Sequence, residues 1–510
     1  MNTNKTGTKT GWVVAGLLLS ILMASMDNTI VATAMGTIVG ELGGLDQFIW
    51  VTSAYMVAEM AGMPIFGKLS DMYGRKRFFI FGIVVFMIGS ALCGTANSIV
   101  ELSLYRAIQG IGAGALVPIT FTVLLDAVSP ENRGKLMGLF GAVFGMSSIF
   151  GPLAGAFLTD YMSWEWIFYI NLPLGIVSLV LVAKYYKESL SRMKQRVDWL
   201  GAVTLVGATV CLIFALELGG KLYAWSSLPI IGLLAGFVIM GVLFLIAEKR
   251  AVEPIISFAM FRVRLFASST LIAILSGAAF IAASVYLPIF IQGVLGGSAT
   301  NSGLMLLPMM LGTVVTATLG GFVMARMSYR TILVSTLALL VLGLGLLTTI
   351  SADSSRLVIT FYMVIVGLGI GASFSVLTNA AIQDIPASQR GSATATLNFL
   401  RSFGMMLGIT IFGILQNHLM TRKLTDMFQG SDTASMPQNV NLQDPYVLME
   451  PSARAAIPEG ILDQLLSGVS SSITDVFLWG LIPALLAVGA ACAMGRKKHD
   501  PKAEMEAYGH

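Results

Sequence analysis

The chain is poor in charged residues. Only 11% of its 510 residues are Asp, Glu, Lys or Arg, whereas 56% are hydrophobic and the mean hydropathy is +0.81. Soluble globular domains carry about 25% charged residues, so this composition excludes a water-soluble globule. The 31 Lys and Arg residues outnumber the 27 Asp and Glu residues by a net charge of +4. That surplus is too small to indicate a nucleic-acid-binding surface.

Cysteine and histidine are also scarce. The three cysteines, Cys93, Cys211 and Cys492, fall within apolar stretches and show no CxxC spacing, which excludes a disulfide framework and a zinc site. The three histidines lie at the edges of apolar stretches or outside them, so a proton relay inside the apolar stretches would depend on carboxylates. No GK[ST] tripeptide occurs, which excludes a P-loop ATPase. Because no nucleophile is paired with a histidine and no metal ligands gather, we expect no enzyme activity, no metal and no cofactor.

Long apolar stretches, in contrast, fill most of the chain. A bilayer core about 30 Å thick takes roughly 20 helical residues to cross, and stretches of that length recur fourteen times. We therefore predict an all-α polytopic membrane protein with fourteen transmembrane helices. The predicted crossings are residues 12–35, 47–67, 78–99, 101–123, 136–159, 165–186, 199–219, 228–247, 266–293, 302–325, 330–350, 357–380, 391–416 and 473–494.

Basic residues distinguish the two sides of the membrane. With the N-terminus inside, 24 of the 31 Lys and Arg residues fall on the cytoplasmic side and five fall outside. Short cytoplasmic loops concentrate Lys and Arg, so this asymmetry predicts an even number of crossings with both termini in the cytoplasm.

Two parts of the chain are related in sequence. Residues 104–115 align without a gap on residues 361–372, and the Arg-Gly pair at 133–134 reappears at 390–391, both at an offset of 257. This offset relates crossings that are eight helices apart, whereas two abutting six-helix halves would be six apart. The alternative is a chance resemblance between glycine-rich helices; we favour a 6 + 2 + 6 arrangement. The predicted parts are a six-helix bundle at 1–195, two inserted helices at 196–262, a second six-helix bundle at 263–494 and a cytoplasmic tail at 495–510.

The second bundle includes a long external loop near residues 417–472, which we expect to be a linker with one short amphipathic helix; a substrate lid is the alternative. The two halves also differ in buried polarity. Arg106 and Gln109 of the first half correspond to Met363 and Val366 of the second. Any proton chemistry is therefore expected in the first six helices.

Two intramembrane charges are expected to lie at similar depth. At about 1.5 Å per residue, Asp27 lies about 12 Å from the outer end of the first helix and Arg106 roughly 8 Å into the fourth. Burial favours a protonated carboxyl group, whereas a nearby arginine favours the ionised form, so together they keep Asp27 titratable. The alternative is a static salt bridge between two helices. Glu59 is expected near the middle of the bilayer, where it either faces a central cavity, or snorkels or hydrogen-bonds to a neighbour.

Several motifs resemble those of the major facilitator superfamily and, within it, the fourteen-helix drug:proton antiporters. Residues 67–77 (GKLSDMYGRKR) resemble the loop motif after the second helix, and residues 104–110 (LYRAIQG) resemble the motif of the fourth. Gly145 with residues 151–155 (GPLAG) resembles the fifth-helix motif that marks antiporters. Two further motifs are similar to those of the fourteen-helix family, although Glu165 replaces a usual arginine in the second: DNTIV at 27–31 and WEWIFYINLP at 164–173.

The resemblance implies a proton-coupled antiporter of the bacterial cytoplasmic membrane that exports lipophilic, often cationic drugs by alternating access. It implies drug-like small molecules, protons and the lipid bilayer as partners, the proton-motive force as energy source, and neither ATP nor nucleic acid. We expect a monomer. A narrow exporter of one metabolite, antibiotic or metal-tetracycline complex is the alternative function.

The motifs also suggest three groups of site residues. Proton coupling is assigned to Asp27, Arg106 and Glu59. Substrate binding is assigned to Asp27, Asn28, Tyr55, Glu59, Gln109, Gln292 and Asn398. Conformational gating is assigned to Gly67, Asp71, Gly74, Arg75, Arg77, Arg133, Gly145, Gly151, Pro152 and Gly155. As alternatives, the basic residues of the third group only set the topology, and its fifth-helix residues only form a packing seam.

Overall fold

The computed structural model describes residues 9–43, 49–128, 130–188, 197–220, 222–296, 299–324, 326–428 and 459–498. These residues form helices joined by turns, and no β-strand occurs among them. The helices up to the inserted pair are α1 (Thr10–Leu42), α2 (Ile49–Tyr73), α3 (Arg75–Cys93), α4 (Ile99–Ala127), α5 (Pro130–Tyr161), α6 (Trp166–Tyr169), α7 (Asn171–Tyr185), α8 (Trp199–Leu218) and α9 (Leu228–Arg250). The later ones are η2 (Met260–Arg262), α10 (Arg264–Ile289), η3 (Phe290–Val294), α11 (Ala299–Val323), α12 (Tyr329–Leu347), α13 (Arg356–Ile382), η4 (Ala387–Gln389), α14 (Arg390–Phe428) and α16 (Glu459–Ala493).

Every predicted crossing coincides with a helix, and the sixth is divided between α6 and α7. Within the described residues, twelve helical stretches are long and apolar enough to cross a membrane. Helices α2 and α5 are not among the twelve, although their 25 and 32 residues provide sufficient length. For the described residues, the structure thus confirms an all-helical fold with many helices that are long and apolar enough to cross a membrane.

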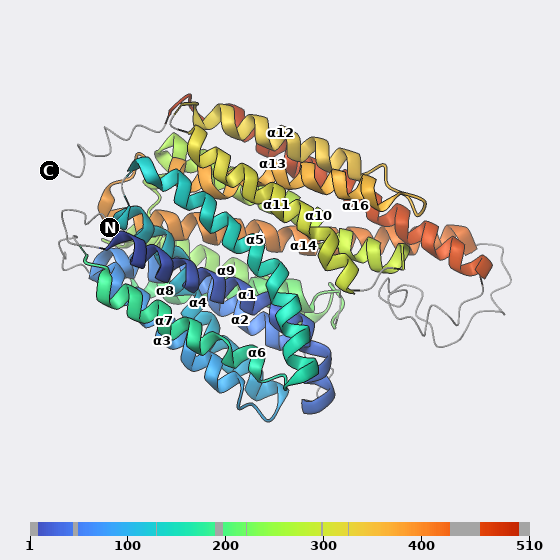
Figure 1. The fold of residues 1–510 in the computed structure, drawn as a ribbon, viewed down its shortest axis with the longest axis horizontal. Helices are drawn as coiled ribbons and strands as arrows, with labels where there is room; N and C mark the ends of the chain where they lie inside the picture. Colours follow the sequence, from blue (N-terminus) through green and yellow to red (C-terminus); the bar gives the residue numbers. More distant parts are fainter. Residues whose placement is uncertain are drawn as a thin grey trace. The chain divides into compact units, whose positions relative to one another are not determined.

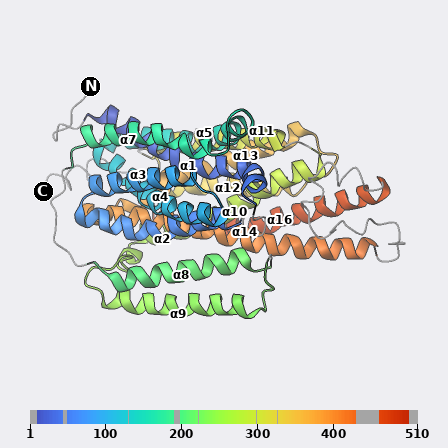
Figure 2. The same cartoon turned by 90° about the horizontal axis from the view of Figure 1, so that it is seen from below.

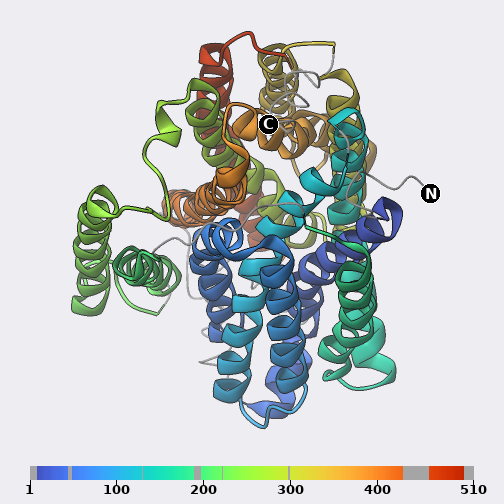
Figure 3. The same ribbon diagram turned by 90° about the vertical axis from the view of Figure 1, so that its left-hand side faces the viewer.

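The chain divides into two compact units. The first comprises Met1–Thr270, Thr378–Leu400 and His499–His510, and the second comprises Leu271–Leu377 and Arg401–Lys498. In the first unit α2 and α3 pack along α4, while α5 and α7 pack on α1 (Figure 1). Helices α8 and α9 pack on each other, and α8 contacts α2; the two green helices lie side by side in Figures 2 and 3. In the second unit α12 packs on α16.

The close packing of α4 depends on glycines. A Cβ atom on Gly110 would collide with the carbonyl oxygen of Tyr55 on α2. A Cβ atom on Gly89 of α3 would lie only 2.5 Å from the backbone nitrogen of Gln109. The backbone of α4 therefore lies directly against both neighbouring helices, a packing that small residues permit. This contact sets the positions of the polar side chains of α4.

We expect Gly110→Val to destabilise the protein, because an added isopropyl group has no space beside Tyr55 and Ala58. Overpacking of this kind typically costs about 1–3 kcal/mol. Gly232→Val is the matched control, since no atom lies within 4 Å of a Cβ built at Gly232. Thermal unfolding in detergent should show a melting temperature several degrees lower for the Gly110 variant only. Equal melting temperatures for the two variants would contradict the packing argument.

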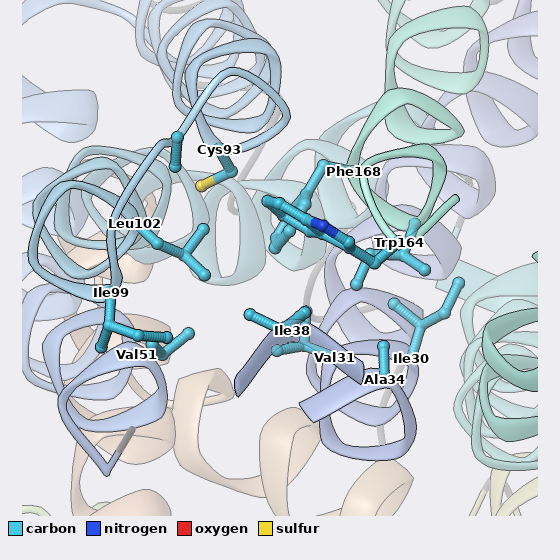
Figure 4. Packing of buried hydrophobic residues seen from close by; sticks show 12 residues of the cluster. Ile30, Val31, Ala34, Ile38, Val51, Cys93, Ile99, Leu102, Trp164 and Phe168 are labelled. Carbon is cyan, nitrogen blue, oxygen red and sulfur yellow. The ribbon is translucent and has the colours of Figure 1, made fainter. Parts of the chain in front are cut away.

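A cluster of buried apolar side chains joins α1, α3, α4 and the segment around α6 (Figure 4). The rings of Trp164 and Phe168 meet edge to face with centroids 6.2 Å apart. The same cluster includes Ile30, Val31 and Ile38 from α1. The indole nitrogen of Trp164 donates a hydrogen bond to Glu41 Oε2 at 3.1 Å. This packing anchors the part of α1 that follows Asp27.

Helical structure extends into the segment that the sequence assigns to a long loop. Helix α14 continues to Phe428, and α16 begins at Glu459. Residues 429–458 lie outside the described part of the chain. The 39 residues of α14 span about 58 Å, well beyond a bilayer core of about 30 Å. Lys423 Nζ lies 2.5 Å from Asp475 Oδ2 and joins the extended part of α14 to α16.

Candidate functional site

Asp27 lies at the centre of a buried polar cluster. Its side chain on α1 is fully buried. The carboxylate pairs with the guanidinium of Arg106 on α4. Oδ1 also accepts hydrogen bonds from Gln109 Nε2 at 2.7 Å and from Asn171 Nδ2 of α7 at 2.9 Å. Three helices thus converge on one carboxylate.

Arg106 is equally buried and is held on several sides. Its Nη1 donates to Gln109 Oε1 at 2.7 Å, and its Nε donates to the carbonyl oxygen of Val51 at 3.3 Å. The guanidinium carbon lies 4.0 Å from the centroid of the Tyr55 ring. A buried ion pair persists only when further hydrogen bonds compensate for the lost water, and this cluster supplies them. Removal of either charge would leave its partner uncompensated.

Two members of the cluster were not assigned a role from the sequence. Asn171 belongs to the 164–173 motif, so the sequence did contain a signal for it. The sequence contained no such signal for Ser90 of α3, because a single serine in an apolar helix does not stand out. Its Oγ accepts from Asn171 Nδ2 at 3.0 Å and from Gln109 Nε2 at 3.2 Å, and donates to the carbonyl oxygen of Phe168 at 2.8 Å. These two residues connect α3 and α7 to the Asp27 pair.

The other predicted coupling and substrate residues are placed differently. Tyr55 is fully buried beneath Arg106, and its hydroxyl has no hydrogen-bond partner among the described residues. Glu59 follows four residues later on α2, is partly exposed, and feels the charges of Arg106 and Asp27. Asn28 is exposed beside the cluster. The cluster therefore unites Asp27, Tyr55, Arg106 and Gln109, with Glu59 at its edge.

The last two predicted substrate residues belong to the second half of the sequence. Asn398 belongs to the first unit, where its Nδ2 donates within α14 to the carbonyl oxygen of Thr394 at 3.0 Å. Gln292 lies in the π-helical segment η3 of the second unit and is partly exposed.

A second polar cluster lies at the opposite end of α2. Asp71 Oδ1 accepts from the backbone N–H of Gly391 at 3.0 Å, and Oδ2 accepts from that of Ser392 at 2.7 Å. Both amides lie in the first turn of α14, where backbone donors lack helical partners and the helix dipole favours an anion. Gly67 lies one turn away on α2, and a Cβ there would collide with Ala395 of α14. Helix α2 therefore lies directly on α14 at this point.

Arg75 completes this inner cluster. It is 1% exposed and pairs with Asp71, at 3.1 Å from Oδ1, and with Asp126 of α4. Its Nη2 also donates to the carbonyl oxygen of Ala387 at 2.9 Å. Tyr186 donates its hydroxyl to Asp126 Oδ2 at 3.2 Å. Asp126 and Tyr186 had not been assigned from the sequence, because they lie about 50 and 110 residues from Arg75 along the chain.

The remaining gating residues have distinct surroundings. Gly74 adopts a φ of +109° at the turn between α2 and α3, a conformation that favours glycine. Arg77 is exposed. Arg133 and Gly145 belong to α5, but their side-chain surroundings lie outside the described part of the structure.

The fifth-helix motif lies along α1. A Cβ on Gly151 would collide with Thr29 Oγ1, and one on Gly155 would collide with Thr33 Oγ1. Pro152, inside α5, is partly buried. These residues form a packing seam between α1 and α5, one turn beyond Asp27.

Comparison with known proteins identifies the family. The model of the Major Facilitator Superfamily matches residues 17–409. The chain belongs to the major facilitator superfamily. It is 51% identical to "Multidrug resistance protein 3" of Bacillus subtilis (strain 168) over 97% of each chain. It is 35% identical to "Multidrug transporter protein MdtP" of the same organism, over 94% of this chain and 91% of the relative.

Solved structures share the facilitator fold. The proton:xylose symporter XylE aligns with a TM-score of 0.60 at 13% identity, covering 97% of this chain and 98% of that one. The human organic anion transporter MFSD10 aligns with a TM-score of 0.61 at 15% identity, over 93% and 99% of the two chains. This facilitator is therefore a multi-pass membrane transporter of the cell membrane, and the expectation that it is not an enzyme is confirmed by its family.

Proposed function

We propose that this facilitator exports lipophilic, often cationic drugs from the cell in exchange for protons. The observation that carries the proposal is the fully buried Asp27 carboxylate, which Arg106, Gln109 and Asn171 contact from two other helices. Ionised Asp27 attracts Arg106, whereas protonated Asp27 loses that attraction. One proton therefore changes how strongly α1 is held to α4 and α7. Charges buried within a membrane are costly and are usually functional.

The substrate class rests on the relatives. The two Bacillus subtilis proteins are named for multidrug resistance and multidrug transport, and their similarity extends over nearly the whole chain. The energy source is the proton-motive force, with no ATP and no cofactor. One proton that moves down about 150 mV releases roughly 3.5 kcal/mol, which supports a drug gradient of several hundredfold.

The proposed topology has fourteen transmembrane helices in a 6 + 2 + 6 arrangement with both termini in the cytoplasm. The six-helix bundles span residues 1–195 and 263–494, residues 196–262 hold the inserted pair, and the tail follows at 495–510. The distribution of basic residues supports this topology. We propose that one polypeptide suffices for transport.

Alternating access requires a gate on the cytoplasmic side. We assign this role to the inner cluster, in which Asp71 binds the first turn of α14 and Arg75 binds the carbonyl oxygen of Ala387. These contacts join α2 to the segment before and at the start of α14, so they must break when the cytoplasmic side opens. Arg75 has Asp126 as a second anion, which retains its charge balance after opening.

The direct test uses purified protein in proteoliposomes. An imposed pH gradient should drive accumulation of tetraphenylphosphonium or ethidium, and a protonophore should abolish it. A rate of drug flux that changes neither with the pH gradient nor with the protonophore would contradict proton coupling. A resistance panel in an efflux-deficient host then separates the alternatives: protection against a single compound would support the narrow exporter of one metabolite, antibiotic or metal-tetracycline complex.

Glu59 provides a test of substrate charge. It is the carboxylate on α2 at the edge of the Asp27 cluster, and in its ionised form a carboxylate in a site of low dielectric attracts cations strongly. We expect Glu59→Gln to weaken resistance to monovalent and divalent organic cations about tenfold while resistance to neutral drugs stays near wild type. Minimum inhibitory concentrations at equal expression measure this difference. An equal loss of resistance to cationic and neutral drugs would instead make Glu59 a coupling residue. Unchanged resistance to both classes would show that Glu59 does not belong to the substrate site.

A further inference from the structure

The inserted helix pair ends in a short segment that reaches the cytoplasmic gate. Residues 251–257, here called the strap, follow α9 and precede η2. Within the strap Ile255 and Ile256 are buried, at 3% and 7% exposure. A connecting segment with no helical hydrogen bonds needs other partners for its buried backbone groups.

Glu248 holds the strap from one side. This residue near the C-terminal end of α9 is 3% exposed, and its Oε1 accepts from the N–H groups of Ile255 at 3.1 Å and Ile256 at 3.4 Å. Asp198 caps the start of α8 through the N–H of Gly201 at 2.8 Å. A Cβ on Gly201 would lie 3.2 Å from Glu248 Oε1, so the Glu248 contact lies at the base of the α8–α9 pair.

The gate holds the strap from the other side. Ser392 Oγ donates to the carbonyl oxygen of Ile255 at 2.9 Å, while the N–H of the same serine donates to Asp71. Lys68 of α2, three residues before Asp71, forms an ion pair with Glu253 of the strap at 2.7 Å. A chain of hydrogen bonds therefore runs from Glu248 through Ile255 and Ser392 to Asp71.

The inserted pair is also attached to α2 near its other end. The rings of Trp50 on α2 and Phe214 on α8 meet at a steep angle with centroids 5.0 Å apart. The pair consequently cannot shift along α2 without disturbing either this contact or the strap.

We propose that α8, α9 and the strap form a clamp that keeps the cytoplasmic gate closed, with Glu248 as its positioning residue. This assignment rests on the proposed function for the role of the gate. Glu248 fixes the strap, the strap fixes the Ser392 hydroxyl, and Ser392 presents its N–H to Asp71. Each link consists of only one or two hydrogen bonds, so the clamp biases the gate and still allows it to open.

Hydrogen exchange of the full-length protein in detergent tests the clamp. Glu248→Leu removes the acceptor for Ile255 and Ile256, whereas Ser392→Ala removes only the hydroxyl bond and retains the N–H that binds Asp71. In both variants we expect peptides covering 388–396 to exchange about fivefold faster than in wild type, which corresponds to about 1 kcal/mol of local stabilisation. Ser392→Thr retains a hydroxyl and should restore slow exchange.

Variants of the Lys68–Glu253 ion pair provide a second test of the clamp by hydrogen exchange. Lys68→Glu should accelerate exchange at 388–396, and adding Glu253→Lys should reverse the effect by restoring the pair in the opposite sense. Lys423→Glu is the matched control, because it makes the same charge change in the Lys423–Asp475 ion pair, away from the strap. Faster exchange confined to 251–257, with 388–396 unchanged in the Glu248 and Ser392 variants, would overturn the clamp.

The same measurements in an Asp27→Asn background separate this proposal from proton coupling. Exchange needs neither drug nor a proton gradient, so the clamp variants should retain their effect there. If Asp27→Asn abolishes proton-driven transport but the clamp variants leave exchange at 388–396 unchanged, the proposed function stands and the clamp is refuted. Should Glu248→Leu fail to fold, Ser392→Ala decides the outcome.

Discussion

Asp27→Asn is expected to abolish proton-driven drug accumulation and to leave a folded protein in the membrane. Asparagine retains the shape and polarity of the side chain, and its carbonyl oxygen can still accept from Gln109 or Asn171. It cannot exchange a proton, and it no longer compensates Arg106. The drug gradient that inside-out vesicles establish under a pH gradient should fall from several hundredfold to about unity, since one coupled proton at about 150 mV accounts for that factor.

A transport assay that needs no protons separates coupling from binding. Exchange of labelled for unlabelled drug across the proteoliposome membrane should persist in Asp27→Asn, because the drug still triggers the conformational change. Asp353→Asn is the matched control: it makes the same chemical change on an exposed loop residue. Proton-driven accumulation at the wild-type level in the Asp27 variant would refute the assignment of Asp27.

Asp71→Ala is expected to reduce drug efflux at least tenfold by weakening closure of the cytoplasmic gate. The substitution leaves the N–H groups of Gly391 and Ser392 without their acceptor and removes one of the two carboxylates that bind Arg75. Loss of a partner from a buried hydrogen-bonded charge costs about 3–5 kcal/mol, which exceeds the net strength of the bonds themselves. The closed gate should therefore become a minor state.

Binding measurements decide whether this loss concerns the gate. Asp71→Ala should bind drug from the cytoplasmic side with near wild-type affinity while it transports poorly, since Asp71 lies far along α2 from Asp27 and Tyr55. Asp71→Asn retains one acceptor oxygen and should show intermediate efflux. Wild-type efflux in Asp71→Ala would exclude the gate role, and a parallel loss of binding would point to misfolding.

The sequence allowed good prediction of the helices, because runs of about 20 apolar residues have few alternatives in a membrane. It also placed Asp27 and Arg106 at similar depth, since helical rise converts residue number into height. The ion pair in the structure agrees with that depth. Depth, however, leaves the rotation of each helix about its axis undetermined.

Because the sequence leaves the rotation of each helix about its axis open, it did not reveal some of the residues that meet in the structure. Ser90 and Asn171 reach the Asp27 cluster only because glycines draw α3 and α4 together and because the cluster around Trp164 anchors the segment before α7. The strap was missed for a related reason. Glu248 and Ser392 lie on opposite sides of Ile255 in space but are separated by more than a hundred residues in the chain. The partners of Glu248 and Ser392 are backbone groups of the strap, which carry no charge pattern that could indicate such a meeting.

Helix α14 has a mechanical consequence for the transport cycle. Its first residues, up to Leu400, belong to the first unit, whereas those from Arg401 onward belong to the second, yet the helix is unbroken from Arg390 to Phe428. When the proposed gate opens, this helix moves as one stiff rod. Its first turn then leaves Asp71 and the strap, and the residues from Arg401 onward carry that motion along some tens of ångströms of helix. The release of two backbone hydrogen bonds at one end of the helix can in this way be transmitted to its other end without any intervening chain of side-chain contacts.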